Sequence, residues 1–224
     1  MQRVEPEDLR RRQLIEATID TMAAEGFAAT TLALIGQKAG VSPGLIAHYF
    51  ADKDGLLEAT LRSMAARLAR GLSTRLRAAR NPRQRVQAVI DTTLAAEEFD
   101  ARTCSVWLAF WGQVIHSTRL RRIQRIYQGR LLSNLRHGLK QIVAADEAAR
   151  VAFAVAAMID GLWLRAALSS PAESDSPAAR AMASAFIDNE IARLAAAKPA
   201  PRRDAPHQKE SRVRNFIGGV YVGR

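Results

Sequence analysis

The sequence predicts an all-α protein in which a small N-terminal three-helix module precedes a larger helical domain. Alanine and leucine, both strong helix formers, are abundant throughout the 224 residues. Apolar residues recur at three- and four-residue spacing, and capping residues, glycines and prolines divide that pattern into segments. We expect the module in residues 1–55, the larger domain in 56–197, and a basic, Pro-rich disordered tail in 198–224.

The N-terminal module is predicted to contain one longer and two short helices. The first covers residues 7–25, where apolar side chains such as Leu14 and Ile19 form one stripe, and Gly26 ends it. Thr30 or Thr31 then caps a short helix over 32–39. Gly40 permits a left-handed turn, and Ser42 caps a helix that begins at Pro43 and ends near Tyr49.

The larger domain is predicted to begin with a long helix. This helix starts at Asp52 or Asp54 and reaches Arg80, because Asn81-Pro82 then breaks the helical pattern. Five further helices are expected over residues 83–98, 103–117, 119–145, 147–168 and 177–196.

Charge alone does not identify the function of the module. The net charge of +11 suits a nucleic-acid-binding protein, but residues 1–68 hold eight Lys and Arg against nine Asp and Glu. A single cysteine, Cys104, cannot form an internal disulfide. The N-terminus lacks the apolar segment of a signal peptide, and no apolar run reaches the roughly 18 residues of a membrane span. These features predict a cytoplasmic protein with no membrane contact.

Residues 31–50 have the layout of a helix-turn-helix. Two short helices meet across the turn at Gly40, and apolar residues such as Ile35 and Ile46 can pack inward and hold the crossing angle. The second helix then presents its polar and small residues outward, where they can enter a DNA major groove. A structural helix pair within a helical bundle is the alternative.

The longer run TTLALIGQKAGVSPGLIAHYFADKDGLLEATL resembles the DNA-binding module of the TetR family of bacterial repressors. The resemblance rests on the Gly26-Phe27 stop, the Ala39–Ser42 turn, and the exit Tyr49-Phe50-x-x-Lys53-x-x-Leu56-Leu57, and it covers roughly the first sixty residues. It implies a DNA-binding repressor that is not an enzyme and whose partner is double-stranded operator DNA.

The resemblance also implies which residues contact DNA. Two helix caps would donate to phosphates, two residues near the end of the recognition helix would contact the backbone, and the first turns of that helix would face base edges. The implied residues are Thr31, Ser42, Pro43, Gly44, Leu45, His48, Tyr49 and Lys53. His48 could instead contact only water, and Lys53 could pair with a carboxylate. The run Arg10–Arg12 could add phosphate contacts or be merely solvated.

The rest of the chain resembles one branch of that family. The stretch from Glu5 onward and the segment CSVWLAFW at 104–111 are similar to repressors that respond to choline and control genes for choline uptake and its oxidation to glycine betaine. The resemblance implies that effector and those target genes. The alternative is a repressor that senses another lipophilic or cationic small molecule.

Aromatic residues in the larger domain suit such an effector. A quaternary ammonium is recognised by aromatic faces, often with a nearby carboxylate. Trp107 and Trp111 share one helical face, and Asp160 lies three residues before Trp163. The candidate effector-binding residues are Trp107, Phe110, Trp111, Tyr127, Asp160 and Trp163. The alternatives are that the aromatic rings are ordinary core and that Asp160 pairs with Arg165 or caps a helix.

The last two predicted helices favour a homodimer. They are apolar over more than one face, and two such helices from each subunit would form a four-helix bundle. A twofold dimer would place its recognition helices about 34–36 Å apart, on successive major grooves. No metal-ligand spacing, phosphate-binding glycine loop or catalytic partner for a histidine is present, so we expect no cofactor, no metal and no enzymatic activity.

Overall fold

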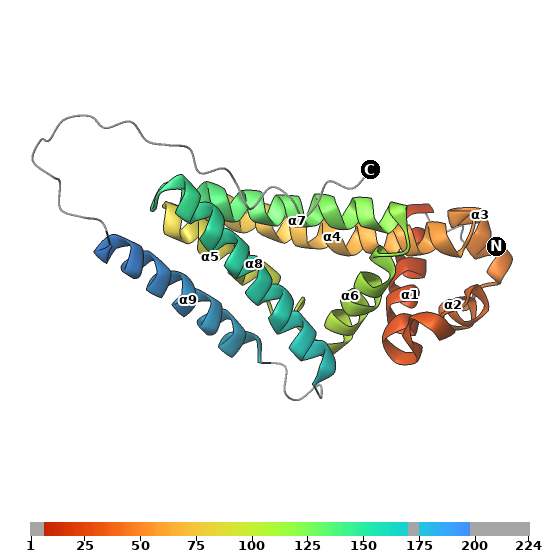
Figure 1. The fold of residues 1–224 in the computed structure, drawn as a ribbon. Coiled ribbons are helices and arrows are strands. Elements are labelled where there is room, and N and C mark those ends of the chain that lie inside the picture. The colour runs from red at the N-terminus through yellow and green to blue at the C-terminus, as the bar shows by residue number, and fades with distance from the viewer. Residues whose placement is uncertain (1–6, 170–174, 198–224) are drawn as a thin grey trace, which may run out of the picture.

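The computed structural model describes residues 7–169 and 175–197, and in this part of the chain it contains nine helices and no strand (Figure 1). The predicted all-α fold is confirmed. The helices are α1 (Glu7–Ala29), α2 (Leu32–Ala39), α3 (Pro43–Phe50), α4 (Lys53–Ala78), α5 (Pro82–Thr93), α6 (Ala101–Val114), α7 (Thr118–Leu139), α8 (Ala145–Leu168) and α9 (Ser176–Ala196). The predicted tail at 198–224 lies outside the described residues.

The N-terminal helices follow the predicted pattern closely. Gly26 has φ 79° and ψ 170°, so α1 kinks there and continues for one more turn to Ala29. Gly40, at φ 67°, takes the left-handed conformation that ends α2. Asp52, rather than Asp54, caps α4 by accepting a 2.7 Å hydrogen bond from the Gly55 amide.

Three predicted boundaries in the larger domain are wrong. α5 ends at Thr93 instead of residue 98, because the chain turns there and brings Glu98 back to a bidentate ion pair with Arg67 of α4. α6 ends at Val114 instead of 117, because Ser117 caps the next helix by accepting a hydrogen bond from the Leu120 amide.

The third wrong boundary is the end of α7, at Leu139 instead of residue 145. Here the chain leaves the helix through turns in which amides 141–143 bond back to the carbonyls of Gly138 and Leu139. A Cβ at Gly138 would lie only 2.7 Å from Val86 of α5. This close approach between α5 and α7 depends on packing, which hydrophobic periodicity alone does not specify.

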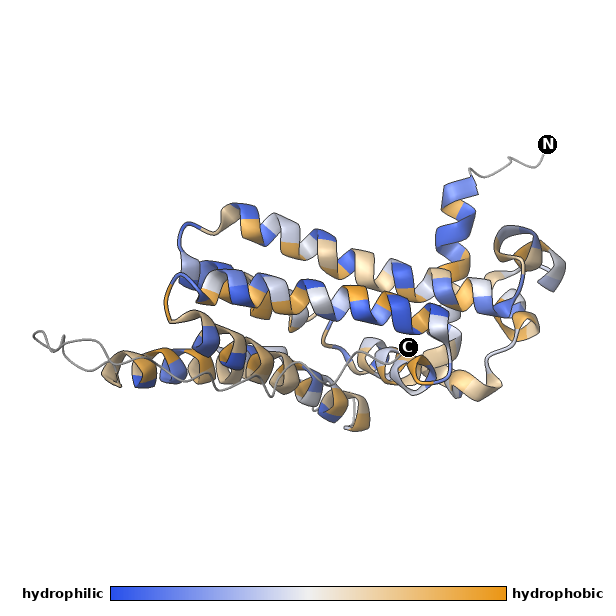
Figure 2. Ribbon diagram, turned by 45° about the horizontal axis from the view of Figure 1, so that its top comes forward, coloured by the Kyte–Doolittle hydropathy of each residue, from blue (hydrophilic) through white to orange (hydrophobic). Residues whose placement is uncertain are grey.

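The helices of the larger domain pack around α6, α7 and α8. α4 and α7 lie side by side, α6 packs against both α1 and α8, and α9 covers α8 and α5 (Figure 1). Hydrophobic and hydrophilic residues alternate along the helices, as expected of helices that each bury one side (Figure 2). α6 therefore connects the N-terminal module to the centre of the larger domain.

One hydrophobic core runs through both parts of the molecule. It extends from Leu14 of α1 and Ile46 of α3, through Trp107 of α6, to Ile187 of α9, and all four side chains are almost fully buried. Because packed cores transmit displacement rather than absorb it, movement in the larger domain has a physical route to the module.

α8 is long and apolar enough, by length and composition, to cross a membrane. Such a helix is weak evidence for a membrane span, because the core helix of a soluble protein passes the same test. Val151, Val155 and Ile159 of α8 are buried in the hydrophobic core. The other side of α8 exposes Phe153 and Leu168, which leaves an apolar face that no described helix covers.

Candidate DNA-binding and effector sites

Two side-chain caps fix the geometry of the helix-turn-helix. The Thr31 hydroxyl accepts a 3.2 Å hydrogen bond from the Leu34 amide at the start of α2. The Ser42 hydroxyl accepts an equivalent 3.2 Å bond from the Leu45 amide at the start of α3. Both hydroxyls stay on exposed residues, so each still has its own proton to donate. The helices cross closely at Gly36, where a Cβ would lie 2.6 Å from the Val41 carbonyl oxygen.

The residues predicted to contact DNA lie on the surface of α2, α3 and the start of α4. The exposed ones are Thr31, Ser42, Pro43, Gly44 and His48, and the half-buried ones are Leu45, Tyr49 and Lys53. The inward side of α3 is anchored by the fully buried Ile46 and by Phe50. The outward side of α3 is thus free to enter a groove, with small side chains where the backbone would approach base edges.

Two basic residues have contacts that the sequence did not indicate. Arg11 donates a 2.6 Å hydrogen bond to the Tyr49 carbonyl oxygen, and its guanidinium lies 4.5 Å from the centre of the Phe50 ring. It therefore ties α1 to the end of α3. The Lys53 amine lies 5.4 Å from the centre of the Phe27 ring and forms no ion pair with a described carboxylate. No short-range spacing links Arg11 with Tyr49, so sequence periodicity could not reveal this contact.

The aromatic residues proposed for the effector converge from three helices. The ring centres of Trp107 and Trp163 are 5.4 Å apart, and those of Trp107 and Tyr127 are 5.2 Å apart. Trp111 stacks on Trp163 at 6.3 Å with 15° between the ring planes. We call Trp107, Trp111, Tyr127 and Trp163, with Asp160, the aromatic cluster. Phe110 is also fully buried in the core, but it makes none of these ring contacts.

Asp160 is the charged member of the cluster. It is half-buried, and within residues 7–169 and 175–197 it has no hydrogen bond or ion pair, including none with Arg165. Burial raises the pKa of its carboxyl to about 6. Burial is also the main cause that raises the pKa of the Tyr127 phenol, and the charges of Asp160 and Glu98 raise it further. The Asp160 carboxylate therefore has no neutralising partner among the described residues.

Hydrogen-bond donors in the cluster are also incompletely paired. The Trp163 indole N–H donates a 2.9 Å bond to the Thr93 carbonyl oxygen. The indole nitrogens of Trp107 and Trp111 are buried and have no hydrogen-bond partner among the described residues. Buried polar groups usually find a partner, so two unpaired donors and an unpaired carboxylate in one aromatic cluster call for an explanation.

Comparison with known proteins covers both parts of the chain. Residues 14–60 match the model of the bacterial regulatory proteins of the tetR family, and residues 82–192 match the BetI-type transcriptional repressor C-terminal model. HTH-type transcriptional regulator BetI of Paraburkholderia xenovorans is 44% identical over 81% of this chain and 93% of its own length. The regulator of the same name from Vibrio parahaemolyticus is 37% identical over 85% and 96%. The chain is a TetR-family transcriptional repressor of the BetI type.

Solved structures agree with this assignment. A putative transcriptional regulator from Pseudomonas aeruginosa superposes on the repressor with a TM-score of 0.73 and 29% identity, over 84% of this chain and 93% of the other. A putative transcriptional regulator from Saccharomonospora viridis, solved in complex with choline, has a TM-score of 0.69 at 22% identity, over 81% and 96%. The second likeness concerns the fold alone.

In this repressor an ion pair joins the helix of the aromatic cluster to the DNA-binding module. Arg102, in the first turn of α6, donates to the Asp20 carboxylate of α1 at 2.8 Å and lies 3.7 Å from Glu16. Trp107 and Trp111 follow Arg102 on the same helix. Since α1 is in turn tied to α3 through Arg11, a continuous chain of contacts leads from the cluster to the recognition helix.

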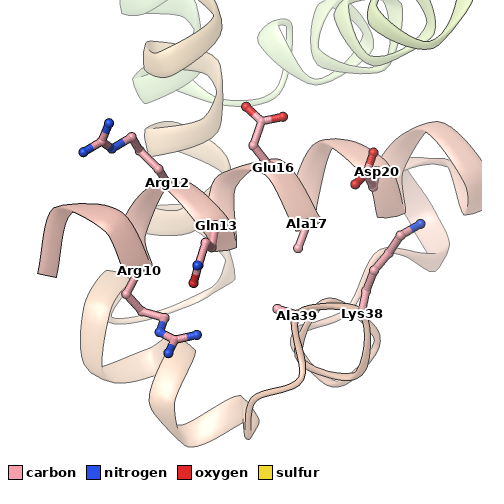
Figure 3. A pocket seen from close by; sticks show the side chains of 8 residues that line it. All are labelled: Arg10, Arg12, Gln13, Glu16, Ala17, Asp20, Lys38 and Ala39. Carbon is pink, nitrogen blue, oxygen red and sulfur yellow. The ribbon is translucent and has the colours of Figure 1, made fainter. Parts of the chain in front are cut away.

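An open cavity of about 500 Å³ lies between α1 and α2 of the repressor (Figure 3). Its lining mixes charges of both signs and consists of Arg10, Arg12, Gln13, Glu16, Ala17, Asp20, Lys38 and Ala39. Lys38 extends from α2 towards the turn of α1 that carries Asp20 (Figure 3). The cleft is open and carries charges of both signs, so it does not indicate one class of ligand. Its lining residue Asp20 is the carboxylate that pairs with Arg102 of α6.

The described residues provide no evident metal site or reactive thiol. No group of three or more His, Cys, Asp and Glu in this part of the repressor could hold a metal ion. Burial raises the pKa of the Cys104 thiol to about 12, so the thiol stays protonated at neutral pH and is a poor nucleophile.

Proposed function

We propose that this repressor controls genes for choline uptake and for the oxidation of choline to glycine betaine, and that choline binding at the aromatic cluster changes its affinity for operator DNA. The observation that carries the proposal is the cluster itself, in which four aromatic rings meet beside an unpaired, half-buried carboxylate. Aromatic faces with a carboxylate are the usual means of binding a quaternary ammonium.

The DNA-binding part of the proposal assigns operator contact to residues 1–55. The exposed hydroxyls of Thr31 and Ser42, together with Tyr49 and Lys53, would position the protein on phosphates. Gly44, Leu45 and His48 would face base edges, with Pro43 starting the helix. The caps and the Arg11 bond support these roles, because they hold α3 in one orientation on α1.

Effector binding and dimerisation are assigned to residues 56–197. TetR-family regulators act as dimers, and the proposed interface here is formed by α8 and α9. Its support is the apolar surface left on these helices, where Phe153, Leu168 and Met182 are 63%, 74% and 56% exposed. Covering such side chains in a four-helix bundle would also explain the high hydropathy of α8 in a protein that we place in the cytoplasm.

A route from effector to DNA follows from how tightly the cluster is packed. Trp107 and Trp163 are almost fully buried and their ring centres lie 5.4 Å apart, which leaves no space for an ammonium group between them. Choline would therefore have to separate α6 from α8. Because Arg102 fastens α6 to α1, that displacement would tilt the module and favour a different spacing of the two recognition helices.

Intrinsic fluorescence offers a direct test. The chain contains three tryptophans, and all three lie in the cluster, so excitation at the indole band reports on this site alone. Choline titration should give a saturable change in emission. In parallel, an operator selected from random duplexes should bind the full-length protein with an affinity that choline alters about 100-fold, equivalent to roughly 3 kcal/mol of coupling.

The two titrations separate the parts of the proposal. Operator binding without any fluorescence response to choline would leave a repressor with a different effector. A lipophilic or cationic small molecule is then the second candidate, since apolar rings and one carboxylate would also suit it. Operator binding that survives deletion of residues 1–50 would overturn the assignment of DNA contact to the module.

A further inference from the structure

The aromatic cluster contains hydrogen-bonding groups that the binding of a quaternary ammonium by aromatic rings does not need. A quaternary ammonium has no N–H, so it can satisfy neither an indole donor nor the acceptor sites of a carboxylate. Yet the cluster contains two buried indole N–H groups, on Trp107 and Trp111, that have no partner in the part of the chain that the structure describes. It also contains Asp160, which has no partner among the described residues. The aromatic rings would suffice to bind the onium group of a ligand. The two indole N–H groups and the Asp160 carboxylate must therefore have another partner on the ligand.

A hydroxyl group supplies what these three groups lack. An alcohol oxygen can accept a hydrogen bond from an indole N–H while its proton is donated to a carboxylate. A carboxylate on the ligand could accept from the indoles but would place a second negative charge beside Asp160. An alkyl group could do neither, and would leave all three polar groups without partners.

Accordingly, and on the basis of the proposed choline-sensing function, we propose that Asp160 is a specificity-determining residue that accepts a hydrogen bond from the effector's hydroxyl, with the Trp107 and Trp111 indoles donating to the same oxygen, so that the site binds short hydroxyalkyl ammonium ions and rejects the corresponding ammonium carboxylates. The repressor would thus distinguish choline from glycine betaine by the polar end of the ligand, since both carry the same trimethylammonium group.

The position of Asp160 supports a role at the ligand rather than in the fold. The candidate partner on the same helix, Arg165, is exposed and forms no ion pair with it. Two other carboxylates of the larger domain are paired with an arginine of a different helix, Glu98 with Arg67 and Asp188 with Arg83. Asp160 differs from these, because it acts electrostatically on Tyr127, which packs against Trp107, and no described cation pairs with it.

The experiment uses the full-length protein and three probes with the same onium group: choline, ethyltrimethylammonium and glycine betaine. Dissociation constants are measured at pH 8 from tryptophan fluorescence, for the unmodified protein and for Asp160→Leu, which removes both the charge and the hydrogen-bond acceptor. The unmodified protein should bind choline at least about tenfold more tightly than the other two, as expected when a buried polar group needs its partner. In Asp160→Leu, choline binding should weaken by about tenfold more than ethyltrimethylammonium binding, so the advantage of choline over both probes should largely disappear.

Asp146→Leu provides the matched control, because it removes one carboxylate from the same helix at an exposed position and should leave all three constants unchanged. Trp107→Phe, which keeps a ring but loses the N–H, should reduce the preference for choline over ethyltrimethylammonium. If Asp160→Leu weakens the binding of choline and of ethyltrimethylammonium equally, Asp160 acts only on the onium charge and the inference is wrong. If no probe binds the unmodified protein, the choline-sensing proposal fails and the inference fails with it.

Discussion

The helix-turn-helix and the aromatic cluster are organised in opposite ways. In the module, the decisive hydrogen bonds are local, since Thr31 and Ser42 each accept from the amide three residues later. In the cluster, the decisive contacts join α6, α7 and α8, and the contact from Trp163 to Thr93 spans 70 residues. The residues proposed to contact DNA lie on the surface, whereas Trp107 and Trp163 are buried.

This difference shows what each site requires of the fold. A DNA-reading helix must be rigid and exposed before its partner arrives, so short-range caps and one tight turn are sufficient. An effector site that signals must be closed in one state and opened in another, so its residues have to join helices that can move relative to each other. The ion pair between Arg102 and Asp20 lies where these two kinds of organisation meet.

The largest expected effect comes from removing a ring of the cluster. Trp107→Ala should lower the free energy of unfolding by about 3–5 kcal/mol, because it leaves a large cavity between α6 and α8. Urea unfolding followed by circular dichroism measures this change. A loss below about 1 kcal/mol would mean that the cluster is loosely packed and that opening it need not move α6.

A comparably disruptive change in the module is Gly36→Ala. The added Cβ would lie 2.6 Å from the Val41 carbonyl oxygen, so α2 and α3 would have to separate at about 1–3 kcal/mol. Operator affinity should fall steeply while choline still quenches or enhances tryptophan fluorescence normally. Gly112→Ala is the control, because nothing lies within 4 Å of a Cβ there. If Gly36→Ala also abolishes the fluorescence response to choline, the N-terminal module and the aromatic cluster do not fold independently of each other.

Asp160 should make stability and effector binding depend on pH. Its carboxyl has a pKa of about 6, raised by burial, so the folded state holds the proton more tightly than the unfolded chain does. Without effector, the contribution is fully present below about pH 4, and about 3 kcal/mol is lost as pH rises from about 4 to 6. Choline affinity should rise around pH 6, where the carboxyl of the folded protein ionises, since the ionised form attracts the cation.

Thermal denaturation between pH 4 and 8 measures the effect on stability, and fluorescence titration between pH 5 and 8 measures the effect on choline affinity. Asp160→Asn should remove both and should stabilise the effector-free protein at pH 7. The other ionisable groups that interact with this part of the cluster are Tyr127, whose raised pKa keeps it neutral in this range, and Glu98, which Arg67 pairs. An unchanged pH profile in Asp160→Asn would show that another group titrates.

A smaller effect tests the connection between the two regions. Arg102→Ala should leave choline affinity nearly unchanged but reduce its influence on operator binding by about 1 kcal/mol, a substantial part of a typical coupling energy. The measurement is operator affinity with and without saturating choline. Arg62→Ala, which removes an exposed pair with Glu58 within α4, serves as control. If choline changes the operator affinity of Arg102→Ala as much as that of the unmodified protein, the two regions are coupled through other contacts of the continuous core.

The smallest effect is expected from a single cap of the module. Ser42→Ala removes the acceptor of the Leu45 amide and should cost about 0.5–1 kcal/mol of stability. Operator affinity should fall by more than stability explains, because the same hydroxyl is proposed to donate to a phosphate. Ser42→Gly, which tolerates the cap conformation, separates the two contributions. If affinity follows stability alone, Ser42 acts only as a cap.

Local signals allowed most of the helices to be predicted from the sequence. Gly26, Gly40 and Asn81-Pro82 interrupt helices where expected, because their effects operate within a few residues. The ends of α5 and α7 were wrong, since Glu98 turns back to Arg67 and Gly138 packs against Val86, both distant in sequence. From the sequence, the three tryptophans were grouped only because aromatic rings suit a quaternary ammonium. Their ring contacts, and the absence of a partner for Asp160 among the described residues, became visible only in the structure.

The sequence by itself determined the all-α fold, the helix-turn-helix and the family to which the repressor belongs, because caps, turns and helical periodicity act over three or four residues. Only the tertiary structure decided that the indole rings pack together, that Asp160 and two indole N–H groups lack partners within residues 7–169 and 175–197, and that Arg102 links α6 to α1. These features depend on how helices far apart in sequence pack together, and helix packing is set by the sum of many weak contacts that no short motif contains.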